Sequence, residues 1–375
     1  MEQILFGPSN NYAEVDKYIE TYSGGSIFLV CGKSFEQMRL YSHLQELKEK
    51  GLKIVRFSDF RPNPSYESVV EGVEKFRKEK TGLILATGGG SALDVAKCIK
   101  LYRRKLPHEH ETEVNETTLD IKFLAVPTTA GTGSEATKFA VIYQNGEKQS
   151  VTDESIVPDA VLFDPSVLTF LPMYHRKATM LDALCHGIES FWSINATAES
   201  QVLSEKAIVE ILKNMERFLK NDPEGNKRMM LAAYTAGKAI NMTQTTAGHA
   251  MCYKLTSLYG IAHGHAAALC IDVLWPWMSE HTSACSDVRG ENYLKMTLAR
   301  LGKLFDAEGS LGYINFQKML KGLKLGSISI RAEDIEFLSN SVNHVRLKNH
   351  PVNMTKEDIR GLYENIRKRN KFDES

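Results

Sequence analysis

Four side chains in this sequence have types and spacings suited to holding one metal ion: Asp182 with His186, and His249 with His263. Asp182 and His186 are four residues apart in a stretch of helical pattern, which puts both on one helix face, roughly 5–6 Å apart at Cβ. One carboxylate and three imidazoles suit Fe(II), Zn(II) or a neighbouring transition metal. With an open coordination position such a centre acts as a Lewis acid toward a carbonyl or alkoxide oxygen, whereas a closed one is structural. Taken singly, each residue is better explained as an ordinary core or surface residue than as a metal ligand.

His249 and His263 can share an ion only if the chain turns back between them. On one straight helix, fourteen residues would separate them by roughly 21 Å. Gly260 stands where a left-handed C-cap can end a helix and redirect the chain. The sequence therefore predicts two helices that meet near Gly260.

Two different patterns of elements must position these residues. In the first half, short β-rich runs such as Ser26 to Cys31 and Gly82 to Thr87 alternate with amphipathic helical stretches, which indicates βαβ units and a parallel sheet. From about Leu171 onward, apolar residues recur at helical spacing. We predict an α/β domain with a Rossmann-like sheet over residues 1–168 and an all-α domain over residues 169–375.

Two loops rich in small residues follow strands of the expected sheet. GGGS at residues 88–91 lies between a strand and a helix, where glycines allow close approach and free N–H groups favour an anion such as pyrophosphate. PTTAGTGSE at residues 127–135 offers hydroxyl donors with little bulk. Separately they fit a tight turn and a flexible connector, but together they favour one shared ligand.

Composition restricts the partners of the chain. Its 375 residues carry 46 basic and 46 acidic side chains, so nucleic acid and anionic membranes are unfavoured as main partners. The N-terminus lacks a signal-peptide pattern and no window is apolar enough to span a bilayer, so we expect a cytoplasmic protein. The six cysteines form no C-x-x-C pair, which disfavours a zinc ribbon or a disulfide scaffold. A small-molecule ligand fits best.

Several separated stretches resemble the iron-containing (group III) alcohol dehydrogenases, over nearly the whole chain. These stretches are GGGSALDVAK, PTTAGTGSE, DALCHGIE and GHAMCYKLTSLYGIAHGHA. The resemblance implies an NAD(P)-binding domain of dehydroquinate synthase type, a helical domain, a divalent metal in the cleft between them, and a homodimer or larger assembly. It implies four metal ligands: Asp182, His186, His249 and His263. The cofactor residues that it implies are Asn63, Gly89, Gly90, Ser91, Asp94, Thr128, Thr129, Thr132 and Lys148.

The resemblance implies hydride transfer between the nicotinamide and a carbonyl carbon whose oxygen is bound to Fe(II) or Zn(II). The protein would then be an aldehyde reductase or alcohol dehydrogenase. A lyase similar to dehydroquinate synthase, or a zinc polyol dehydrogenase, would use the same scaffold. The pair Asp182 and His186 favours the dehydrogenase over the lyase. A third alternative, a non-catalytic metal or nucleotide binder, requires every match to be vestigial.

Departures from the family pattern bear on specificity. Many members carry an aspartate after the strand at residues 26–31, where it would repel a 2′-phosphate. Here Gly32, Lys33 and Ser34 follow that strand, which favours NADP(H) over NAD(H).

The residues next to the proposed ligands bear on the substrate. Tyr253 stands where many members have a histidine, and it fits a proton donor near the reacting centre or a packing residue equally well. Lys254 and His265 would bind an anionic substrate group if they face the cleft, although Lys254 also fits an ordinary surface lysine. YKLTSLYGIAHGHAAAL is similar to the branch that reduces phosphonoacetaldehyde. Short aliphatic aldehydes and diols are alternative substrates.

Overall fold

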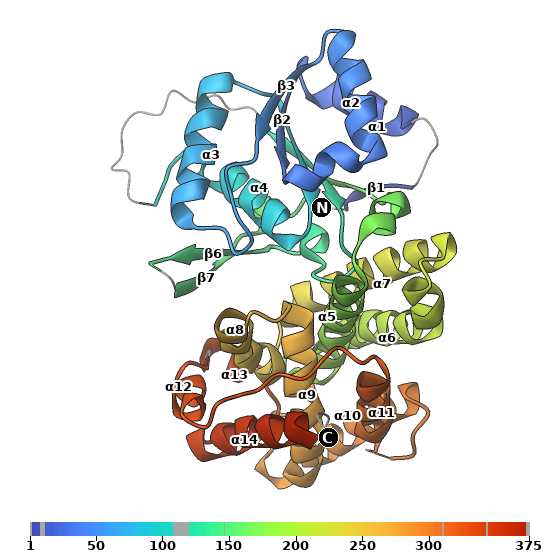
Figure 1. The fold of residues 1–375 in the computed structure, drawn as a ribbon, viewed down its shortest axis with the longest axis vertical. Helices are drawn as coiled ribbons and strands as arrows, with labels where there is room; N and C mark the ends of the chain where they lie inside the picture. The colour runs from blue at the N-terminus through green and yellow to red at the C-terminus, as the bar shows by residue number, and fades with distance from the viewer. Residues whose placement is uncertain are drawn as a thin grey trace. The chain divides into compact units, whose positions relative to one another are not determined.

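The computed structural model describes residues 2–7, 12–107, 120–145, 147–309, 311–342 and 344–372. The chain divides into two compact units, Met1–Phe170 and Leu171–Ser375. The first is built around a sheet and the second from helices (Figure 1). Within the described residues, no helix combines the length and the hydropathy needed to cross a bilayer.

The first unit contains a parallel sheet with the strand order β1-β8-β5-β4-β2-β3. Its strands are β1 (Ile4–Phe6), β2 (Ser26–Cys31), β3 (Lys53–Phe57), β4 (Leu83–Gly88), β5 (Lys122–Pro127) and β8 (Ala160–Leu162). A hairpin follows β5, made of β6 (Phe139–Gln144) and β7 (Glu147–Thr152). Among its described residues there are also four short 3-10 segments, η1 (Lys33–Gln37), η2 (Ser134–Ala136), η3 (Glu154–Ile156) and η4 (Pro165–Phe170).

Helices cover both faces of this sheet. They are α1 (Ala13–Tyr22), α2 (Arg39–Glu49), α3 (Tyr66–Glu79) and α4 (Gly90–Tyr102). Alternate residues of β2 point to opposite faces: Phe28 packs into the core formed with α3 and α4, and Leu29 into the core formed with α1 and α2. Burial on both faces explains why these strands are almost uniformly apolar. The predicted α/β fold is confirmed.

The second unit is helical, apart from an isolated bridge between Cys285 and Val352, as far as the structure describes it. Its helices are α5 (Met173–Trp192), α6 (Ala198–Leu219), α7 (Pro223–Thr243), α8 (Ala247–Tyr259), α9 (His263–Glu280), α10 (Glu291–Leu304), α11 (Gly312–Gly322), α12 (Asp334–Asn340), α13 (His344–Leu347) and α14 (Lys356–Phe372), with a 3-10 turn η5 (Thr282–Ala284). Helix α5 packs against α6, α7 and α9, and every residue from Met180 to Trp192 is buried. The polar residues of this stretch therefore need partners inside the protein.

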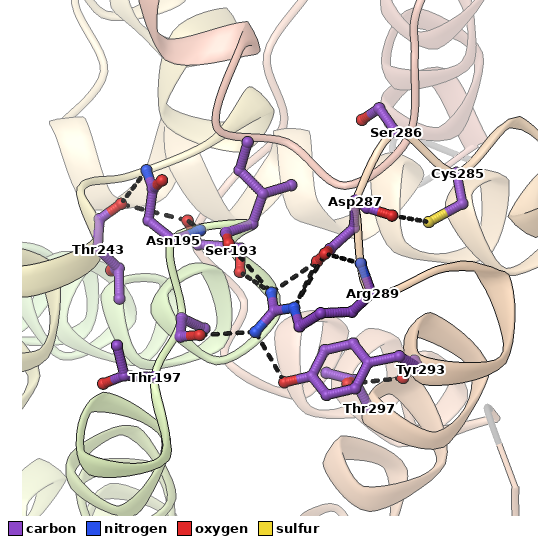
Figure 2. Close-up of polar contacts among 12 residues, drawn as sticks. Ser193, Asn195, Thr197, Thr243, Cys285, Ser286, Asp287, Arg289, Tyr293 and Thr297 are labelled. Carbon is purple, nitrogen blue, oxygen red and sulfur yellow. Dashed lines mark hydrogen bonds and ion pairs between the residues drawn. The ribbon is translucent and has the colours of Figure 1, made fainter.

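A clamp around Arg289 fixes the turn that follows α5 (Figure 2). Its guanidinium donates to the backbone oxygens of Ser193 (3.0 Å) and Ala196 (2.6 Å) and pairs with Asp287 (2.6 Å). Asn195 donates from its amide to the backbone oxygen of Thr243 (3.2 Å) at the end of α7. The end of α5 is thereby tied to the segment that leads into α8.

Candidate metal centre

Helices α8 and α9 meet at the turn predicted from the sequence. Gly260 has φ 68° and ψ 13°, the left-handed conformation, and its N–H donates to the backbone oxygen of Thr256 (3.0 Å). His249 lies in the first turn of α8, and His263 is the first residue of α9. The reversal at Gly260 thus brings together two histidines that are far apart in sequence.

Gly264 allows the start of α9 to approach α5. A Cβ at this position would overlap the backbone oxygen of Ala178 and lie 2.7 Å from the backbone nitrogen of Asp182. Any side chain here would push the two backbones apart. The glycine of the HGH stretch is therefore required by the close packing that puts His263 beside Asp182.

The four predicted ligands converge on the carboxylate of Asp182. Its Oδ1 lies 3.5 Å from Nε2 of His249 and 3.9 Å from Nε2 of both His186 and His263. Ligand atoms of Asp182, His249 and His263 all lie within 4.8 Å of one another. The ring of His186 stacks on that of His249, with centroids 4.6 Å apart. We call these four residues the Asp182 cluster.

The side chains of this cluster fit a divalent cation. Oδ1 of Asp182 and Nε2 of His249 are buried and make no hydrogen bond to any described residue. Polar atoms left in this state are costly, and a cation between them would remove that cost. The nitrogen and carboxylate donors suit Fe(II) and Zn(II). Burial alone would raise the pKa of Asp182, but the neighbouring histidines hold it below its ordinary range.

Glu189 supports this cluster and was missed by the sequence analysis. It is fully buried, and its Oε2 pairs with Nδ1 of His249, leaving Nε2 to face Asp182. Its Oε1 accepts from the backbone N–H (3.0 Å) and the hydroxyl (2.6 Å) of Thr246. A carboxylate behind a histidine sets its tautomer and orientation, as at many metal sites. The available signal was a carboxylate seven residues after Asp182, on the same face of an apolar helix.

The field of the two carboxylates favours positive charge at His249. Burial alone would lower the pKa of this histidine, but the charges of Glu189 and Asp182 raise it to about 9. Burial would likewise raise the pKa of Glu189, whereas His249 and the surrounding donors lower it to about 2. A site that stabilises a proton so strongly is also one in which a metal cation is stabilised.

Of the three residues predicted near the substrate, the structure brings Tyr253 to the cluster. Its ring lies parallel to that of His263, with centroids 5.8 Å apart and planes at 7°. Burial raises the pKa of its phenol, so the group is protonated at neutral pH. A donor beside the cluster is thus available.

Lys254 and His265 make other contacts. Lys254 Nζ lies over the ring of Phe337, 5.7 Å from its centroid. Nδ1 of His265 lies 3.2 Å from the hydroxyl of Tyr174, and burial lowers the pKa of this histidine to about 4. His265 also borders a cavity of about 720 Å³ whose other walls include Leu269 and Gln317. The structure does not bring these two side chains to the Asp182 cluster.

The two loops predicted to bind the cofactor are neighbours in the first unit. β4 pairs with β5 with Gly88 opposite Pro127, and the N–H of Thr128 donates to the backbone oxygen of Gly88 (2.9 Å). A Cβ on Gly89 would lie 3.3 Å from Thr129 Cγ2. Similarly, a Cβ on Gly90 would lie 3.1 Å from Thr132 Cγ2. Small residues therefore let the loops pack together at the start of α4, whose first N–H groups can bind an anion.

The remaining predicted cofactor residues lie around the same helix. Asn63 adopts φ 59°, and its N–H donates to Ser91 Oγ (3.3 Å). Both oxygens of Asp94 accept hydrogen bonds within the protein, from Ser134 Oγ (2.7 Å) and the N–H of Val141 (3.0 Å). Asp94 thus connects α4 to the second loop. Lys148, on β7, exerts its charge on Asp94.

Gly32, Lys33 and Ser34 lie at the end of β2, where η1 begins. Lys33 and Ser34 are exposed. The guanidinium of Arg56, on the adjacent strand β3, donates to the backbone oxygen of Gly32 (3.4 Å). Lys33 and Arg56 therefore both lie next to Gly32, and Arg56 is paired with Glu36 (2.6 Å).

Comparisons with known proteins cover nearly the whole chain. Residues 2–165 match the family model "Iron-containing alcohol dehydrogenase", and residues 177–367 match "Fe-containing alcohol dehydrogenase family, C-terminal". The chain is 28% identical over 361 residues to alcohol dehydrogenase 4 of Saccharomyces cerevisiae, covering 92% of each. It is 27% identical over 308 residues to the phosphonoacetaldehyde reductase of Streptomyces viridochromogenes, covering 78% of each.

A solved structure gives the same result for the fold. The iron-containing alcohol dehydrogenase of Thermococcus thioreducens superposes with a TM-score of 0.84, covering 98% of this chain and 99% of that one, at 21% identity.

Proposed function

The chain belongs to the iron-containing alcohol dehydrogenase family, and from this premise we propose that it is a metal-dependent aldehyde reductase that uses NADPH. Family membership implies a metal and a nicotinamide cofactor. The observation that carries the proposal is the convergence of Asp182, His249 and His263 around buried, unsatisfied ligand atoms. The alternatives based on a lyase or a polyol dehydrogenase are not favoured.

In this proposal the Asp182 cluster, including His186, holds Fe(II). The ion supplies Lewis acidity to the oxygen of the aldehyde or alcohol. Glu189 keeps Nε2 of His249 directed at the cluster, and the phenol of Tyr253 can donate a hydrogen bond near His263. Zn(II) would fit the same donors, and iron is preferred here because of the family.

The cofactor is assigned to the loops of the first unit. Gly89, Gly90, Ser91, Thr128, Thr129 and Thr132 would bind its phosphates and nicotinamide side, with Asn63, Asp94 and Lys148 around them. Gly32, Lys33 and Ser34 would hold the 2′-phosphate. The exposed side chain of Lys33 supports NADPH over NADH, since an amine attracts a phosphate dianion, whereas the nearby Arg56 is paired with Glu36 (2.6 Å).

Phosphonoacetaldehyde is the substrate that we propose first. Its support is the likeness of the α8–α9 region to that branch, together with the named relative from Streptomyces. The family resemblance further supports a homodimer or larger assembly.

The proposal is tested by an assay of the purified protein after loading with Fe(II). Oxidation of NADPH is expected with phosphonoacetaldehyde, and it should stop when a chelator removes the metal and return when Fe(II) is restored. Short uncharged aldehydes and NADH are assayed in parallel. The dehydrogenase function would be rejected if no aldehyde supported metal-dependent oxidation of either cofactor.

The cofactor preference gives a separate prediction. Changing Lys33 to aspartate should lower kcat/KM for NADPH about tenfold, because a charge-assisted hydrogen bond contributes roughly 1.5 kcal/mol and would be lost. The value for NADH should stay within about twofold. Lys53→Asp is the control. Lys53 lies at the opposite end of β3 from Arg56, and it pairs with Glu79. Equal losses for both cofactors would contradict a contact with the 2′-phosphate.

A further inference from the structure

A cavity of about 720 Å³ is bordered by α9, α11, α14 and residues 324–327 of the second unit. Residues 324–327 belong to the segment that leads from α11 to α12, which crosses α9 in the view of Figure 1. Protein cavities that bind small molecules usually measure roughly 300–1,000 Å³. None of the four residues of the Asp182 cluster is among the described walls of this cavity. It is therefore large enough for a ligand of its own.

Hydrogen bonds and an ion pair hold the walls of this cavity together. The carboxylate of Asp272, on α9, pairs with Arg369 of α14 (2.7 Å), and its backbone oxygen accepts from the side-chain amide of Gln317 on α11 (2.9 Å). The amine of Lys177 donates to the backbone oxygen of Leu323, just after α11 (2.6 Å). The walls are thus fixed before a ligand enters, which lowers the cost of binding one.

One part of the lining is apolar. Each of the surrounding segments contributes an aliphatic side chain: Leu269 from α9, Leu320 from α11, Leu325 from the segment after it and Ile366 from α14. Covering such surface with hydrocarbon removes it from water, and this gain is roughly proportional to the area covered. The lining therefore favours a ligand with an alkyl part.

His265 adds a buried hydrogen-bond donor to the same lining. Its side chain is only 3% exposed and borders the cavity. The hydroxyl of Tyr174 accepts from the N–H of Ala262 (2.9 Å), and Nδ1 of His265 is the acceptor that the hydroxyl hydrogen can reach among the described residues (3.2 Å). Nδ1 thus accepts, and the neutral ring carries its hydrogen on Nε2. No described residue accepts from Nε2, so this donor lacks the partner that a buried N–H requires.

Lys324 adds a positive charge. It is exposed, and within the described residues its amine makes no ion pair or hydrogen bond. Asp272, the carboxylate of the lining, is paired with Arg369. An anion in the cavity would therefore be attracted to Lys324.

We propose that this cavity is a binding site for a medium-chain alkyl carboxylate. The carboxylate accepts a hydrogen bond from Nε2 of His265 and is attracted by the ammonium of Lys324. The alkyl chain packs against the aliphatic side chains of the lining, among them Leu269 and Leu320. A ligand of this class satisfies the buried donor, the unpaired charge and the apolar wall together. The inference does not rest on the proposed reductase function, because the site shares no lining residue with the Asp182 cluster.

The test is a calorimetric titration of the metal-loaded protein with octanoate. A dissociation constant below about 1 mM is expected for a ligand of this size. Octanamide has the chain without the charge, and acetate has the charge without the chain, so each should bind at least about tenfold more weakly. Removal of the metal with a chelator should change the dissociation constant for octanoate by less than about twofold.

Substitutions in the lining locate the bound octanoate. Lys324→Gln and His265→Phe should each raise the dissociation constant about tenfold, the scale of a hydrogen bond to a charged group. Lys303→Gln, an exposed lysine on α10, is the matched control for the charge. Leu269→Trp should fill the cavity and abolish binding, whereas Leu258→Trp, an exposed leucine on α8, should leave it unchanged. The melting temperature of each variant shows whether it is folded.

Several results would overturn the inference. Equal affinities for octanoate and octanamide would mean that the cavity does not recognise an anion. Wild-type affinity in both Lys324→Gln and Leu269→Trp would place the bound octanoate elsewhere on the protein. Loss of binding when the metal is removed would assign the carboxylate to the metal ion. If the wild type did not bind octanoate at all, the inference would fail, while metal-dependent aldehyde reduction would be judged by its own assay.

Discussion

Replacing Asp182 with alanine is expected to lower kcat/KM about 10³-fold and to leave the purified protein without bound metal. The carboxylate is the point on which the three histidines converge, with Oδ1 between 3.5 and 3.9 Å from each Nε2. Without it the cluster loses its only anionic ligand, and three imidazoles alone bind Fe(II) more weakly. Metal content by elemental analysis and aldehyde-dependent NADPH oxidation measure the two effects.

The control for this change lies on the same helix. His175, in the first turn of α5, is exposed, and His175→Ala should retain both metal and activity. A near-wild-type melting temperature for Asp182→Ala would show that the loss is not one of folding. Wild-type metal content in that variant would contradict the ligand assignment.

The fold was predictable because its signals are local. Strands such as β2 are apolar throughout, since both faces are covered, and that run reads as a buried parallel strand. The reversal that joins α8 to α9 was equally predictable, because Gly260 is the residue that a left-handed cap requires. In both cases a few adjacent residues determine the conformation.

Other parts of the site depend on contacts that sequence spacing does not report. Lys254 and His265 are close to the ligands in sequence, yet a helix turns each residue by about 100°, so neighbours point in different directions. Gln244, at the end of α7, adopts φ 60° and ψ 174°, a combination almost restricted to glycine, and this conformation is also a property of the folded backbone.

The contact between Glu189 and His249 is expected to contribute to metal affinity. Changing Glu189 to glutamine is expected to weaken metal binding about 100-fold, at the upper end for a residue behind a metal ligand. The isosteric amide keeps the volume but can donate a hydrogen bond from its N–H to Nδ1 of His249. The imidazole then carries its single hydrogen on Nε2. An imidazole in that tautomer cannot offer Nε2 to the cation that Asp182 faces.

The measurement is the dissociation constant for Fe(II) or Zn(II), obtained by competition with a chelator at fixed pH. Excess metal should restore the activity of Glu189→Gln, because the change acts on Nε2 of His249 and not on the substrate. Glu189→Asp keeps the charge and should recover part of the affinity, whereas Glu199→Gln, on the exposed start of α6, should have none of these effects. If Glu189→Gln bound metal as tightly as the wild type, the orientation of His249 would have to be set by the backbone of α8 alone.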